Sequence, residues 1–84
     1  MQEQALYYVY LLMSIKSGKL YYGYTNNLKR RVAEHQADGY WQLLYYEAYH
    51  AEQDARIREW RLKHYGQARA HLKKRLQRTL EGAN

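Results

Sequence analysis

The first third of the chain has the pattern of two strands joined by a turn. Residues 6–13 are apolar or aromatic at nearly every position, which is typical of a central strand that is covered on both faces. Residues 14–18 have the composition of a turn, and residues 19–25 predict the returning strand of a hairpin. Gly23 lies inside this second strand, where the missing side chain indicates a bulge or a close approach to the backbone.

A helix is predicted directly after the hairpin, ending at about Gln36. Asn26 or Asn27 can cap it, because an asparagine side chain accepts a hydrogen bond from an amide of the first turn. Leu28 and Val32 lie one helical turn apart and predict the side that packs on the sheet.

The second half of the chain predicts one more strand and two more helices. Residues 43–48 have strand composition, while residues 51–65 and 67–80 have helical periodicity, with Gly66 as a stop between them. The first of these helices has one apolar stripe of Ala51, Ala55 and Leu62. Its second apolar face predicts packing on two sides and consists of Ile57, Trp60 and His64. The last helix turns inward Ala68, Leu72, Leu76 and Leu80.

The predicted order is therefore β-β-α-β-α-α, an α/β (α+β) fold with a small three-stranded, mainly antiparallel sheet flanked by helices. The 84 residues are expected to form a single domain, residues 1–84, with its core at about 6–80. A domain of this size buries only about 60–65% of the surface that its unfolded chain exposes, so the whole chain is needed to form one core. A catalytic domain and a separate binding domain are therefore not expected together.

Composition and charge narrow the function classes. A net charge of +6 and a pI near 9.6 predict a polyanionic partner, of which nucleic acid is the commonest. An incidentally basic protein is the alternative. The absence of cysteine excludes disulfides, thiolate metal sites and cysteine nucleophiles, and it fits a cytoplasmic location. No run approaches the ~20 apolar residues of a membrane span, so no membrane partner is expected.

Glu59 is unusual because it falls within the apolar stripe of its helix. A carboxylate on an inward face needs a polar site, a cation or a metal, since burying it unpaired is costly. One carboxylate with waters and a substrate phosphate can hold Mg²⁺ or Mn²⁺. Alternatively, Glu59 lies at the rim and pairs with Arg56 or Lys63 of its own helix.

Two further pairs carry side chains suited to phosphate chemistry. Arg31 and His35 are four residues apart and therefore share a helix face. An arginine can donate two parallel hydrogen bonds to a phosphate, and a histidine can accept or donate a proton. Tyr10 and Tyr21 lie on the two hairpin strands, and a tyrosine acts as a base only if its pKa of about 10 falls. The alternatives are an ordinary amphipathic helix and a cross-strand pair of core aromatics.

The candidate residues described above, taken in their order along the chain, resemble the motif of the GIY-YIG nuclease family. The resemblance extends from about residue 7 to residue 76. The five positions that match the family's motif are Tyr10, Tyr21, Arg31, His35 and Glu59. The chain looks most like the small stand-alone members, which are little more than the catalytic module. It departs from the family in having Tyr8 for the first glycine and a short connection after His35. It also lacks the asparagine that larger members carry about a dozen residues after the glutamate, where the nearest polar residues are Gln67 and His71.

The resemblance implies a divalent-metal-dependent endonuclease that hydrolyses DNA phosphodiester bonds, with low sequence specificity and with 5′-phosphate and 3′-hydroxyl products. Glu59 is expected to ligate one Mg²⁺ or Mn²⁺ and Arg31 to clamp the phosphate. Tyr10 would orient or deprotonate the attacking water, with His35 relaying the proton. Tyr21 would position the phosphate or a metal-bound water.

The DNA itself is expected to be single-stranded or structured rather than defined by sequence. The residues expected to attract its backbone are Lys29, Arg30, Lys63 and the outer face of the last helix, formed by Arg69, Lys73, Lys74, Arg75 and Arg78. That last face can instead be a solvated surface. The alternative function is a nucleic-acid-binding module with weak or lost nuclease activity. The oligomeric state is left open.

Overall fold

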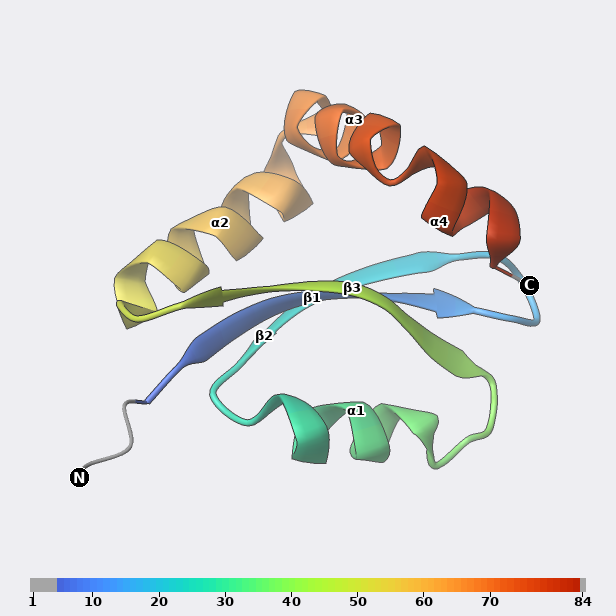
Figure 1. The fold of residues 1–84 in the computed structure, drawn as a ribbon, viewed down its shortest axis with the longest axis horizontal. Coiled ribbons are helices and arrows are strands. Elements are labelled where there is room, and N and C mark those ends of the chain that lie inside the picture. Colours follow the sequence, from blue (N-terminus) through green and yellow to red (C-terminus); the bar gives the residue numbers. More distant parts are fainter. Residues whose placement is uncertain (1–4, 84) are drawn as a thin grey trace.

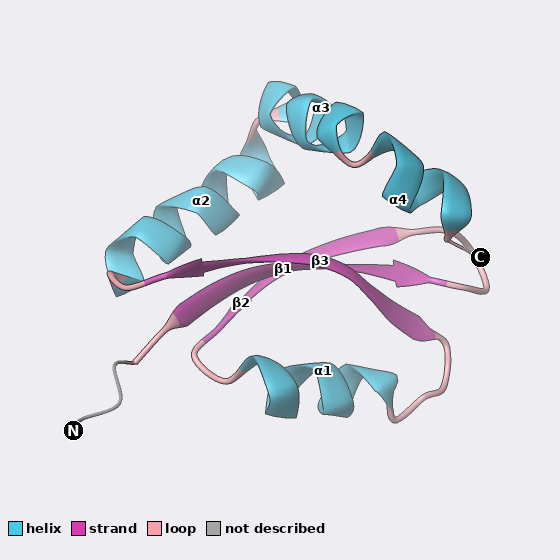
Figure 2. Ribbon diagram, in the orientation of Figure 1, coloured by secondary structure: helices cyan, strands magenta, loops and turns pink. Residues whose placement is uncertain are grey.

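The computed structural model describes residues 5–83, and its three strands form one antiparallel sheet with helices on both faces (Figure 1). The strand order is β2-β1-β3, and α1 covers one face while α2, α3 and α4 lie over the other, as Figure 2 shows. The elements are β1 (Tyr7–Ser14), β2 (Leu20–Thr25), α1 (Leu28–Gln36), β3 (Trp41–Tyr49), α2 (Glu52–His64), α3 (Gly66–Arg75) and α4 (Gln77–Gly82). The predicted fold class is confirmed.

The central strand β1 is buried on both faces, as its apolar composition predicts. Val9 and Leu11 point to the core under α2 and α3, where they meet Ala55, Leu62 and Leu72. Tyr10 and Leu12 alternate with them and therefore point to the face that α1 covers. The main hydrophobic core thus lies on one side of the sheet, and the other side carries a buried tyrosine.

The boundaries differ from the predicted ones mainly at β3. This strand is longer than predicted, and its pairing with β1 shifts register between Leu11 and Leu12. Tyr45 pairs with Leu11 and Leu43 with Leu12, so Leu44 is the extra residue of a bulge. The helix before β3 begins as predicted, and Asn27 is its cap: its side-chain oxygen accepts a hydrogen bond from the amide of Arg30 at 3.1 Å.

The prediction that α2 packs on two sides is wrong. Ala55 and Leu62 are buried, but the face with Ile57, Trp60 and His64 is exposed. After His64 the chain turns at Tyr65, whose extended backbone ends α2, and α3 then covers the core beside α2 rather than its outer face (Figure 1).

The last predicted helix is divided in two at Leu76, whose ψ of 21° departs from the helical value. The structure accordingly has one more helix than the predicted order. Within residues 5–83, no helix combines the length and the apolar character that crossing a bilayer requires.

Candidate active site

Tyr10 and Tyr21 lie on the same face of the hairpin. Tyr10 pairs with Gly23 and Tyr21 with Leu12, so the two tyrosines are diagonal neighbours across the strands. Their ring centroids are 6.3 Å apart. Because strand side chains alternate with a period of two, this register is the one that brings both phenols to the face of α1.

Gly23 makes room for the Tyr10 ring. A Cβ atom built at Gly23 would lie far inside van der Waals contact with Cζ and Oη of Tyr10. The glycine predicted from sequence to mark a close backbone approach does so, and the approaching group is the Tyr10 phenol. The bulge of this sheet lies elsewhere, in β3.

The Tyr10 side chain is a neighbour of three other candidate residues, Tyr21, Arg31 and His35. Its hydroxyl is 3.3 Å from Nε2 of His35, and the His35 ring is 5.1 Å from that of Tyr21, centroid to centroid. Burial raises the pKa of Tyr10 to about 12; the Tyr21 phenol raises it too, while the Arg31 guanidinium acts in the opposite direction. Tyr10 therefore keeps its proton at neutral pH.

Arg31 is held near this group by an exposed ion pair. Its Nη1 donates to Oε1 of Glu34 at 3.2 Å, and this hydrogen bond, followed by the nearby Tyr10, raises the pKa of the guanidinium above its ordinary value. Exposed pairs of this kind contribute little to stability, because solvent screens them. A phosphate could therefore replace Glu34 as the partner of Arg31 at little cost.

Glu59 comes from the opposite face of the sheet. Its carboxylate is 24% exposed and pairs with Nζ of Lys63 at 3.0 Å, the partnership foreseen as the alternative to a metal. Lys63 in turn lies 5.8 Å from the centroid of the Tyr21 ring. Tyr21 is on the edge strand β2, so His35 of α1 and Lys63 of α2 both reach its ring, and Glu59 and Tyr21 share Lys63 as a neighbour.

The residues present suit a metal ion that is not fully enclosed by protein. Within residues 5–83, no group of three or more His, Cys, Asp or Glu side chains is positioned to hold a metal. Mg²⁺ is commonly bound through one or two carboxylates, with waters and substrate phosphates filling its other positions. The single carboxylate of Glu59 is compatible with this mode.

A basic hollow of about 310 Å³ adjoins Arg31. Its lining residues are Tyr24, Thr25, Asn26, Arg30, Arg31, Glu34, Glu52 and Arg56. Arg56 forms a two-nitrogen contact with Oε2 of Glu52 at 2.9 and 3.1 Å, and its guanidinium lies 4.5 Å above the Tyr24 ring. The spacing of Glu52 and Arg56 on one helix indicates their pairing, but no sequence signal indicated that Arg56 would face Arg31.

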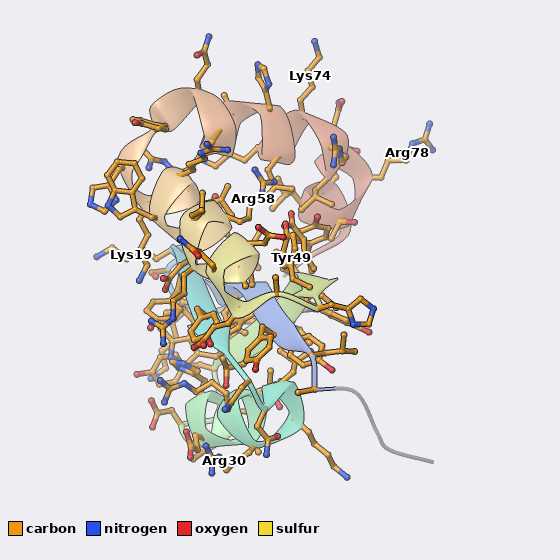
Figure 3. The ribbon with its side chains drawn as sticks, turned by 90° about the vertical axis from the view of Figure 1, so that its left-hand side faces the viewer. Lys19, Arg30, Tyr49, Arg58, Lys74 and Arg78 are labelled. Atoms are coloured by element: carbon orange, nitrogen blue, oxygen red, sulfur yellow. The ribbon has the colours of Figure 1, made fainter. Side chains whose placement is uncertain are left out.

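The other predicted basic residues are spread over the surface. Lys29 is exposed on α1 but does not line the hollow, whereas Arg30 does. In Figure 3, Lys74 and Arg78 project at the end of the molecule opposite Arg30, so α3 and α4 do not extend the same basic surface. Of the two polar residues near the missing asparagine, Gln67 is exposed on α3, and His71 lines a different hollow with Lys74 and Arg75.

A second group of tyrosine, arginine and glutamate joins β3 to α2 and was not predicted. We call it the β3–α2 network: Tyr45, Glu47, Tyr49 and Arg58. Glu47 accepts from Arg58 at 2.9 and 3.1 Å, from the Tyr45 hydroxyl at 2.6 Å, and from the Tyr49 hydroxyl. Figure 3 labels Tyr49 and Arg58 close to one another beside α2. Arg58 directly precedes Glu59, so the network fixes the part of α2 that carries this carboxylate.

In a comparison with known protein families, the family model for the GIY-YIG catalytic domain matches residues 6–74. The match includes both hairpin strands, α1, β3, α2 and most of α3. No curated protein and no solved structure matches the chain.

Proposed function

The chain belongs to the GIY-YIG family of nucleases, and from this premise we propose that it is a divalent-metal-dependent endonuclease that hydrolyses phosphodiester bonds in DNA. The observation that carries the proposal is that side chains from α1 and from α2, which cover opposite faces of the sheet, both reach Tyr21 on the edge strand β2. There the Tyr10, Tyr21 and His35 rings form one group, and Lys63 links Glu59 to it.

Glu59 would hold Mg²⁺ or Mn²⁺ together with phosphate oxygens and waters. When bound, such an ion neutralises charge on the scissile phosphate and on the leaving oxygen. Lys63 would then give up its 3.0 Å contact with Glu59 and become free to contact the DNA backbone. Because both side chains are partly exposed, this exchange costs on the order of 1 kcal/mol.

Tyr10 and His35 would manage the attacking water. The pKa of Tyr10, raised to about 12, supports an orienting role rather than deprotonation of the water. The His35 imidazole, 3.3 Å from the Tyr10 hydroxyl, would accept the proton, since an unprotonated ring nitrogen can act as a general base. Tyr21 is more exposed to solvent than Tyr10, and it would position the phosphate.

Arg31 would clamp a nonbridging oxygen of the phosphate as negative charge develops on it. Arg30 and Arg56 line the same hollow and would contact the neighbouring backbone, to which Lys29 and Lys63 add charge. Contacts to phosphates carry no sequence information, which supports low sequence specificity. Affinity should accordingly fall steeply as salt is raised.

The decisive experiment compares wild type with Glu59→Gln on a panel of single-stranded, duplex, flapped and branched DNA. Wild type should cut in Mg²⁺ or Mn²⁺ and stop in EDTA. Glu59→Gln should lose cleavage by at least about 10²–10³-fold, the scale of removing one electrostatic stabiliser, and should still bind DNA.

The matched control is Glu81→Gln, an exposed carboxylate on α4 that should cut like wild type. If wild type binds DNA in a salt-sensitive way, yet neither ion produces any cleavage, the nuclease proposal fails and the chain is a nucleic-acid-binding module.

A further inference from the structure

The outer face of α2 carries ordered aromatic rings that no part of the chain from residue 5 to residue 83 buries. We call Trp60, His64 and Tyr65 the aromatic platform. Trp60 is 48% exposed and Tyr65 51% exposed. The Trp60 and His64 rings stack at 4.5 Å and 20°, Tyr65 meets Trp60 edge-on at 5.2 Å, and Nδ1 of His64 is 2.8 Å from the Trp60 carbonyl oxygen. These contacts hold the rings in place without placing them in the core.

The platform borders the candidate active site. On α2, Arg56 lies four residues before Trp60 and Lys63 three residues after it, which places their Cβ atoms about 5–6 Å from that of Trp60. Arg56 lines the basic hollow with Arg31. Lys63 pairs with Glu59 and approaches the Tyr21 ring. One row of cations therefore separates the aromatic rings from the residues proposed to act on the phosphate.

The surroundings of the platform favour a polyanion over a second copy of the chain. Exposed aromatic patches on small domains usually mark interaction sites. Here the patch is edged by Arg56 and Lys63 on a chain with a net charge of +6, so two copies would bring like charges together. DNA offers the complementary combination, because its phosphates suit the cations and its bases have flat apolar faces.

We propose that the aromatic platform stacks an unpaired base of the DNA strand next to the cut, and so selects single-stranded or branched substrates. The inference rests on the proposed function, because it takes DNA as the substrate. A base in a duplex is already stacked between its neighbours, whereas an unpaired base is free to stack on protein aromatics. The row of Arg56 and Lys63 would carry the phosphates that flank this base.

Binding to single-stranded and blunt duplex oligonucleotides, measured by fluorescence anisotropy in EDTA, tests the proposal. Stacking of one base on an aromatic ring predicts that Trp60→Ala weakens single-strand binding by about 5- to 150-fold and leaves duplex binding nearly unchanged. Trp60→Phe should recover much of the loss. The matched control is Tyr46→Ala, which removes a 52% exposed ring on β3 and should not affect binding. Thermal melting followed by circular dichroism checks that each variant folds.

A double-mutant cycle gives the sharper readout. Moving a single abasic nucleotide along the single strand should reveal one position at which wild type loses affinity and Trp60→Ala loses none.

Equal effects of Trp60→Ala on single strand and duplex, or no effect, overturn the platform while leaving the nuclease proposal intact. So does a wild-type dimer that Trp60→Ala dissociates without changing DNA affinity. Strand-selective binding through Trp60 without any metal-dependent cleavage supports the platform and defeats the nuclease proposal. Absence of any binding or cleavage by wild type defeats both.

Discussion

The chain uses tyrosine, arginine and glutamate twice, once on each side of α2. In the β3–α2 network, both oxygens of Glu47 accept hydrogen bonds from three side chains at once. At the β2 edge, Glu59 pairs with a single lysine, and the Tyr10 hydroxyl has a longer contact of 3.3 Å with His35. The first group is closed, since its strong acceptor is saturated by protein donors. The second leaves hydrogen-bonding capacity for a ligand.

This difference distinguishes the structural cluster from the candidate active site more clearly than residue type does. Burial would raise the pKa of Glu47, but the hydrogen bonds from Arg58, Tyr45 and Tyr49 outweigh it and lower that pKa. The situation at the β2 edge is different. Burial is the main influence on Tyr10, the neighbouring Tyr21 acts in the same direction, and together they raise the pKa of Tyr10 to about 12. The closed group therefore stabilises a charge, whereas the open group holds a neutral phenol beside cations that are available to a phosphate.

The largest effect should come from removing the guanidinium of the open group. Arg31→Ala should slow cleavage by about 10²–10³-fold, because it deletes a charge aimed at the phosphate in the transition state. Because its pair with Glu34 is exposed, the free energy of unfolding should stay close to that of wild type. Single-turnover cleavage and urea unfolding measure the two quantities. A variant that unfolds early would show that Arg31 belongs with the structural arginines.

The reverse pattern is expected for Glu47→Ala in the closed group. Removing Glu47 leaves Arg58, whose side chain is only 26% exposed, without its ion-pair partner. Breaking a fully buried pair costs about 3–5 kcal/mol, and partial exposure reduces the expected loss to about 2–4 kcal/mol. Urea unfolding should detect it, with Glu59→Ala as the matched control that changes stability little. Equal destabilisation by the two substitutions would contradict the distinction between the groups.

A smaller effect, on both activity and stability, is expected for Gly23→Ala. The new methyl group would collide with the Tyr10 ring, which is buried and cannot move aside freely. Overpacking of this kind costs about 1–3 kcal/mol, and the displaced phenol should lose its contact with His35. Gly18→Ala is an informative comparison, since it strains a backbone with φ of 75° but meets no atom within 4 Å. If cleavage falls equally in both, the Tyr10 position is not what Gly23 protects.

The fold class and the proximity of Tyr10, Tyr21 and His35 could be predicted from the sequence better than the closed group, for a physical reason. Strand periodicity and turn residues determine the hairpin register, so the shared face of Tyr10 and Tyr21 follows from short-range pattern. The pairing of Glu47 with Arg58 spans eleven residues and depends on how α2 is oriented over β3, which no local spacing encodes. The exposure of Trp60 was missed for the same reason, because periodicity identifies an apolar face but not whether another element covers it.

The smallest expected effect is an acid dependence that distinguishes the half-buried carboxylate of Glu47 from an exposed one. The pKa of Glu47 lies below its ordinary value of 4.5 in the folded chain and returns to it on unfolding. Its contribution to stability is therefore present above about pH 4.5 and is lost as pH falls through the lowered pKa. Urea unfolding at a series of pH values should show that the free energy of unfolding falls less steeply with acid for Glu47→Gln than for wild type. Glu52→Gln is the comparison: hydrogen bonds from Tyr24 and Arg56 also lower the pKa of Glu52, but solvent screens this exposed group, so its curve should stay closer to wild type. Coinciding curves for the two variants would mean that the β3–α2 network is as open to solvent as the site edge.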